Sequence, residues 1–287
     1  MNNRYIFSGH ESFPCKTLWL KKGYDFVISG KDFNSADAVI DLGVGKNMVS
    51  SIRYWLKAFA LTESDSLTPI ATYLLDSATG KDPYIEDLGT LWLLHFNLVN
   101  CGEATLYNWF FNRFQKEHIE FDKIQIQDFV HRSMIEADKG KLYNENTVKK
   151  DIAVLLLNYL SPEKTNFSED YSSLLLDLDL ILTKRDEVGK TYLFNFEGKR
   201  NIAPEIFLYA ILKVSDKQKT IPFNLLQDLG HVFCMTPLET IDMLQNIASE
   251  FPDVVNYSDV AGIRQIQFVA EITPKVILDK YYNNANV

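Results

Sequence analysis

A pair of glycines, Gly43 and Gly45, lies between two stretches with helical spacing and constrains the fold more than any other feature. Glycine adopts positive φ without steric cost, so this pair predicts a tight turn. The apolar residues after the turn recur at helical intervals and predict a helix that packs one face against a core: Val49, Ile52, Leu56 and Phe59. A shorter helix is expected before the turn, with an apolar face made of Ala36, Val39 and Ile40. Together these patterns outline a helix-turn-helix.

The second of these helices is expected to carry polar residues on an outer face that meets solvent. Asn47 is expected to cap the helix, because an asparagine side chain can accept a backbone N–H of the first turn. A lysine and free amides at a helix start can contact a DNA phosphate, while polar side chains further along reach into a groove. The predicted DNA-binding residues are Lys46, Asn47, Ser50, Ser51 and Arg53. The segment 61–75 is expected to supply a wing and then a short helix.

The net charge of −9 first argues against a nucleic-acid partner, but the charge is unevenly distributed. Residues 1–57 hold eight basic and five acidic side chains, a net charge of +3, so the rest of the chain carries −12. DNA contact is therefore expected on a small basic face near the N-terminus, with modest and salt-sensitive affinity. The acidic remainder is expected to bind protein partners.

The composition is that of a globular protein, with 46% hydrophobic and 23% charged residues in 287. Three isolated cysteines form neither a disulfide framework nor a zinc pattern, and no apolar run approaches the ~20 residues that cross a bilayer. No signal-peptide pattern is present either. We therefore expect a cytoplasmic protein without membrane association. Two domains are expected, a winged helix-turn-helix DNA-binding module over 1–80 and a helical domain over 81–287 that ends in a winged-helix-like segment.

The rest of the chain predicts a mainly α fold with short β-hairpins. The middle is expected to be helical, with the rings of residues 105–114 in a core and a helix from Asn146 that turns Lys149 and Lys150 outward. Near the C-terminus, Thr236 and Glu239 form a capping-box pattern that begins an amphipathic helix. Two strands follow it, which makes this segment winged-helix-like. The same order also occurs in folds that never touch DNA, so contact with DNA and contact with protein both stay open here.

The segment 8–14 is the first candidate for chemistry, because it places His10 next to Glu11 between a glycine and a proline. Imidazole titrates near neutrality, and carboxylate oxygen suits Mg²⁺. The alternative is structural: Glu11 caps or pairs with a lysine, and His10 packs in a turn. The zinc pattern H-E-x-x-H is absent.

Four blocks in order, 7–14, 19–24, 42–49 and 52–56, resemble a bacterial family long catalogued as of unknown function, the SspB-like family. Members of this family occur in DNA phosphorothioation gene clusters. The resemblance implies a Mg²⁺-dependent DNA nickase in phosphorothioate modification and phage defence. Its partners would be double-stranded DNA and other phosphorothioation proteins, namely desulfurase, ATP-pyrophosphatase and ATPase components. On this resemblance Glu11 would hold the metal ion, His10 would be a catalytic acid or base, and Lys46, Asn47 and Arg53 would position DNA.

Two other classes of protein stay open from the sequence. One is a non-catalytic winged-helix protein that binds DNA as a regulator or recruits modification enzymes. The other is a structural adaptor whose acidic body binds a basic partner.

Overall fold

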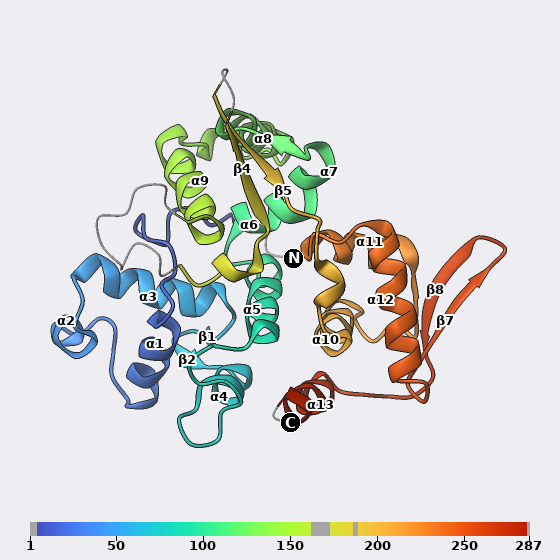
Figure 1. The fold of residues 1–287 in the computed structure, drawn as a ribbon. Helices are drawn as coiled ribbons and strands as arrows, with labels where there is room; N and C mark the ends of the chain where they lie inside the picture. The colour runs from blue at the N-terminus through green and yellow to red at the C-terminus, as the bar shows by residue number, and fades with distance from the viewer. Residues whose placement is uncertain (1–4, 162–172, 186–188, 286–287) are drawn as a thin grey trace. The chain divides into compact units, whose positions relative to one another are not determined.

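The computed structural model describes residues 5–161, 173–185 and 189–285, and it is mainly helical with small antiparallel sheets, as expected (Figure 1). The chain divides into two compact units, Met1–Asn195 and Phe196–Val287. The predicted module 1–80 lies inside the first unit, and its independence as a domain stays a prediction. Within the described residues, every helix is too short or too polar to cross a bilayer.

The first unit contains the expected helix pair, α2 and α3, and the expected hairpin, β1–β2, preceded by the helix α1. Its elements are α1 (Trp19–Ile28), α2 (Ala38–Leu42), α3 (Lys46–Ala58), β1 (Thr62–Glu63), β2 (Ser66–Leu67) and α4 (Pro69–Leu75). Gly43 ends α2 in the left-handed conformation with φ 63°, which confirms the predicted glycine turn. The predicted apolar stripe of α3 is also confirmed, because Val49, Ile52, Leu56 and Phe59 are all buried.

Two predictions for the helix pair are wrong. Gly45, not Asn47, is the N-cap of α3, and no side chain caps it, because the helix already begins at Lys46. The apolar face of α2 is also different. The short helix begins at Ala38 and turns the pair Ala38 and Leu42, four residues apart, toward the core, so Ile40 is 80% exposed.

The remainder of the first unit combines helices with a small three-stranded sheet. Its elements are α5 (Leu88–Asn100), α6 (Thr105–Trp109), the π-helical turn η1 (Phe110–Phe114), α7 (Gln115–Glu117), β3 (Glu120–Phe121), α8 (Lys123–Glu136), η2 (Gly140–Leu142), α9 (Glu145–Tyr159), η4 (Leu176–Leu178), β4 (Ile181–Arg185) and β5 (Lys190–Phe194). The strand order is β3-β5-β4, with both pairs antiparallel. The rings of Phe110, Phe111 and Phe114 are fully buried, as predicted, and pack against rings on the sheet.

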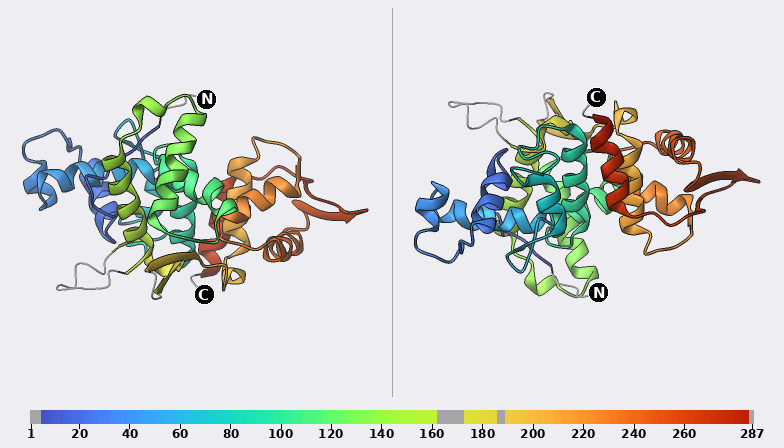
Figure 2. Two further views of the ribbon diagram at one scale, coloured as in Figure 1. Left: turned by 90° about the horizontal axis from the view of Figure 1, so that it is seen from above. Right: turned by 90° about the horizontal axis from the view of Figure 1, so that it is seen from below.

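The second unit contains the predicted capping box and hairpin. Its elements are η5 (Lys199–Asn201), α10 (Pro204–Val214), β6 (Thr220–Pro222), α11 (Phe223–Val232), α12 (Pro237–Glu250), β7 (Val255–Val260), β8 (Ile263–Phe268) and α13 (Pro274–Ala285). At the start of α12, Thr236 accepts the Glu239 N–H while the Glu239 carboxylate accepts the Thr236 N–H. The hairpin β7–β8 projects from the helices of this unit (Figures 1 and 2), and β6 pairs with β8 in the order β6-β8-β7.

Candidate functional site

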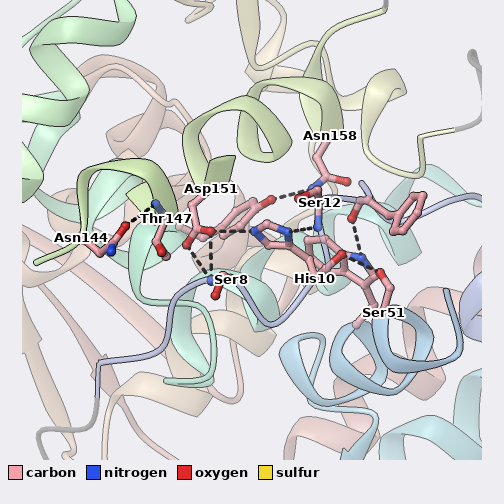
Figure 3. A network of polar contacts seen from close by, with 11 residues as sticks. Ser8, His10, Ser12, Ser51, Asn144, Thr147, Asp151 and Asn158 are labelled. Atoms are coloured by element: carbon pink, nitrogen blue, oxygen red, sulfur yellow. Dashed lines mark hydrogen bonds and ion pairs between the residues drawn. The ribbon is translucent and has the colours of Figure 1, made fainter. Parts of the chain in front are cut away.

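The segment Ser8–Pro14 is held against helices α9 and α3 by a buried polar network (Figure 3). Asp151 of α9 accepts the Ser8 N–H with both carboxylate oxygens, at 2.9 and 3.0 Å. The same carboxylate lies 3.0 Å from Nε2 of His10. The side chains of both partners are almost completely buried, with 2% of His10 and 5% of Asp151 exposed. A buried carboxylate is stable only when its oxygens are hydrogen-bonded, so this segment and α9 depend on each other.

The hydrogen bonds of the His10 ring assign its tautomer. Nδ1 accepts the backbone N–H of Ser12 at 3.1 Å, so Nδ1 carries no proton. The proton is therefore on Nε2, which donates to Asp151. Both ring nitrogens are occupied, and neither is free to bind a metal ion or take a proton from water. A catalytic role for His10 thus requires one of these bonds to open, and that role stays a prediction.

Aromatic rings and a glycine fix the position of this histidine. The ring stacks on Trp55 with centroids 6.0 Å apart and meets the edge of Tyr54 at 5.9 Å. A Cβ on Gly9 would come within 2.3 Å of the Tyr54 ring, so only glycine fits this approach. The backbone turns sharply here, with positive φ at Ser8, Glu11 and Ser12. The segment thus follows one defined path over α3.

A second set of polar contacts ties the end of the segment to the same helices. The side-chain carbonyl oxygen of Asn158, on α9, accepts the Cys15 N–H at 2.9 Å, and the side-chain amide nitrogen of Asn158 donates to the Tyr107 hydroxyl. The indole N–H of Trp55 donates to the Phe13 carbonyl at 3.1 Å. Burial raises the pKa of the Tyr107 phenol, so this hydroxyl stays protonated near neutral pH. These groups serve as fixed hydrogen-bonding partners rather than as proton carriers.

Glu11 lies exposed on the turn beside this network. The carboxylate of Asp151 faces inward to Ser8 and His10 and is not shared with Glu11. Among the described residues, no group of three His, Cys, Asp or Glu side chains is placed to hold a metal ion. The described residues therefore do not fit a Mg²⁺ site at Glu11.

The predicted DNA-binding residues of α3 do not share one surface. Lys46, Asn47 and Ser50 are exposed on its first turns. Ser51 was expected on the same face, but it is fully buried and its hydroxyl donates to the His10 carbonyl at 3.0 Å. The buried face of α3 is wider than its apolar stripe, because it also receives the segment Ser8–Pro14. Ser51 is therefore corrected from a DNA contact to a structural residue.

Arg53 is engaged by the hairpin that follows α3. Its guanidinium donates to both carboxylate oxygens of Asp65, at 2.8 and 2.5 Å, and to the Asn34 side chain at 3.1 Å. This hydrogen-bonded pair raises the pKa of Arg53 and lowers the pKa of Asp65. The Arg53 charge is offset within the protein, so among the predicted residues Lys46 supplies the positive charge of this face.

Sequence reasoning missed the residues that hold the network together, Asp151 and Asn158. Asp151 carried a usable signal, since it lies three residues after Val148 and next to Ile152 on the expected apolar face of α9. A lone acid on an apolar helix face predicts a buried partner. The identity of that partner, 141 residues earlier in the chain, had no local signal.

Comparison with known proteins shows the family to which the chain belongs. Residues 7–282 match the model of a family described as a protein of unknown function, DUF4007, and the chain belongs to this family. Its fold is similar to a crystal structure of magnesium ion-bound SspB, with a TM-score of 0.85 and 24% identity. A second SspB crystal structure gives a TM-score of 0.83 and 25% identity. Both alignments cover 98% of this chain and 89% of the other, which confirms the SspB-like resemblance. No curated protein sequence matches the chain.

Proposed function

We propose that the chain is a Mg²⁺-dependent DNA-nicking endonuclease that acts in bacterial DNA phosphorothioate modification and phage defence. The observation that carries the proposal is the likeness to SspB along nearly the whole chain, including a structure solved with magnesium ion. The resembling blocks 7–14 and 52–56 support it, because they supply His10 and the Trp55 ring on which His10 stacks. Its partners would be double-stranded DNA and the other proteins of the modification pathway.

In this proposal residues 1–80 form a winged helix-turn-helix module that contacts DNA. The helix pair α2–α3 followed by the hairpin β1–β2 supports this assignment. Lys46, Asn47 and Ser50 are exposed on the first turns of α3, where side chains and free amides can bind a phosphate. Arg53 joins them only when its ion pair with Asp65 opens.

Nicking of supercoiled plasmid in the presence and absence of Mg²⁺ tests the proposed activity. The family resemblance assigns the essential carboxylate to Glu11, although Glu11 belongs to no group of three possible metal ligands among the described residues, and this variant tests that assignment. On the assignment, Glu11→Gln is expected to slow plasmid relaxation about 100-fold or more, which corresponds to about 3 kcal/mol of barrier. Because Glu11 is exposed, the Glu11→Gln protein is expected to have the same melting temperature as the wild type.

The matched control is Glu63→Gln, an exposed carboxylate on β1 that is given no role in the reaction. Undiminished nicking by Glu11→Gln would remove Glu11 from the site. His10→Ala is expected to lose nicking as well, and its melting temperature separates loss of chemistry from loss of the fold.

DNA binding through the start of α3 is tested by Lys46→Glu. Replacing this exposed cation with an anion is expected to weaken binding to duplex DNA at low salt about tenfold, because phosphate contacts dominate such affinities. Lys213→Glu, an exposed lysine of the second unit, is the control. Equal affinities for the two variants in fluorescence anisotropy would contradict the assignment.

A second candidate function is a non-catalytic protein that binds DNA and recruits or regulates modification enzymes. The observation that favours it is the donor set around Glu11, which does not fit a metal site within the described residues. This candidate predicts salt-sensitive binding of duplex DNA with no nicking in purified protein. The plasmid assay therefore separates the two.

A further inference from the structure

Two parts of the chain repeat one order of elements: a helix, a short strand, a pair of helices and a hairpin. In residues 105–194 this order is the continuous helix 105–117, β3, α8, α9 and β4–β5. In residues 204–268 it is α10, β6, α11, α12 and β7–β8. The sheets agree as well, because in each the first short strand pairs with the last, giving β3-β5-β4 and β6-β8-β7.

The repeats also agree in how their second helix begins. Asn144 caps α9 by accepting the N–H of Thr147, and Thr236 caps α12 by accepting the N–H of Glu239. In a helix-turn-helix protein, the turn before this second helix and its first turns are the surfaces that approach DNA. Both repeats therefore present an equivalent surface whose chemistry can be compared.

The charges of these two surfaces are opposite. Across the turn and the start of α9, residues 137–150, the chain has four lysines and two carboxylates, Asp138 and Glu145. The matching residues 229–242, which cover the turn and the start of α12, have two carboxylates and no lysine or arginine. A phosphate backbone is attracted to the first surface and repelled by the second.

The lysines of the first surface are available for a ligand. Lys139, Lys141 and Lys150 are exposed, and within the described parts of the chain none of the three has an ion pair. Lys149 differs, because it pairs with Glu145 at 2.5 Å. The acid next to Lys150 is Asp151, whose carboxylate is buried and bonded to Ser8 and His10. The outer face of this helix start thus presents free positive charge.

We propose that Lys139, Lys141 and Lys150 form a second contact with the phosphate backbone of duplex DNA, separate from the contact at the start of α3. The inference rests on the proposed function, since it adds a site for the same substrate. A second contact enlarges the number of phosphates that the protein neutralises. It therefore makes binding steeper in its dependence on salt than α3 alone allows.

The test is a salt titration of binding to a fluorescein-labelled DNA duplex, followed by anisotropy in EDTA so that no strand is cut. The triple variant of the full chain is Lys139→Gln, Lys141→Gln and Lys150→Gln. It is expected to reduce the magnitude of the negative slope of log affinity against log salt by about 3, so that binding becomes less sensitive to salt. The matched control removes the same charge from exposed positions of the second unit: Lys213→Gln, Lys217→Gln and Lys219→Gln. The triple arginine variant at 139, 141 and 150 keeps the charge and is expected to keep the slope.

Each outcome decides one point. A lower slope in the first glutamine variant, with the control and the arginine variant like the wild type, supports the second contact. Equal slopes for the two glutamine variants overturn it, while binding by the wild type leaves the proposed function standing. A wild-type chain that binds no duplex at low salt overturns the proposed function and this inference together.

Discussion

Replacing Asp151 by alanine is expected to lower the free energy of unfolding by about 3 kcal/mol. The change leaves the Nε2–H of His10 and the backbone N–H of Ser8 without their acceptor in a buried site. Each buried donor without a partner costs about 1–3 kcal/mol, and no smaller residue at this position can replace both bonds. Urea unfolding followed by circular dichroism measures the difference.

Two further variants keep this prediction specific. Asp151→Asn retains one carbonyl oxygen that can accept both donors, so its loss is expected to be about half as large. Glu145→Ala removes an exposed carboxylate from the same helix and is expected to leave unfolding close to the wild type. An Asp151→Ala protein as stable as the Glu145→Ala protein would show that the network does not hold Ser8–Pro14 in place.

The second large effect is expected for Trp55, which is completely buried between the segment Ser8–Pro14 and the first unit's core. Trp55→Ala is expected to destabilise the protein by about 4 kcal/mol, because it leaves a cavity beneath the His10 ring. Trp55→Phe keeps an aromatic ring but leaves the Phe13 carbonyl without its donor, and a loss of about 1–2 kcal/mol is expected.

The control for this series is Tyr84→Ala, because Tyr84 is 57% exposed. That variant is expected to unfold within about 0.5 kcal/mol of the wild type. If Trp55→Ala behaved like Tyr84→Ala, the stacking of His10 on Trp55 would carry no stability. Thermal melting of the same variants provides an independent measure of the ranking.

Features fixed by neighbouring residues were predictable from sequence. The glycine turn at Gly43 and the capping box at Thr236 each depend on residues within a few positions, and both are present in the structure. The family resemblance also came from short blocks near the N-terminus. These features involve backbone conformations and local hydrogen bonds that a short sequence determines.

Features that depend on distant contacts were not predictable. Ser51 is buried because a segment some 40 residues earlier covers it, which the periodicity of α3 does not encode. The strand β6 has only three residues and exists because β8 pairs with it. The structure likewise leaves Glu11 exposed and ties His10 to Asp151, a partner that no spacing pattern identified.

The long span of the bonds between the N-terminal segment and α9 has a consequence for synthesis. Ser8 and Cys15 are each separated by 143 residues from the side chain that accepts their N–H. At about 5–20 residues per second, a ribosome needs on the order of 10 s to add that length of chain. During this time α3 emerges without the partner that secures its covering segment. The nascent chain thus exposes an N-terminal region that lacks its hydrogen-bonding partners on α9, and a chaperone can bind this region. Its folding is completed only after α9 has left the exit tunnel.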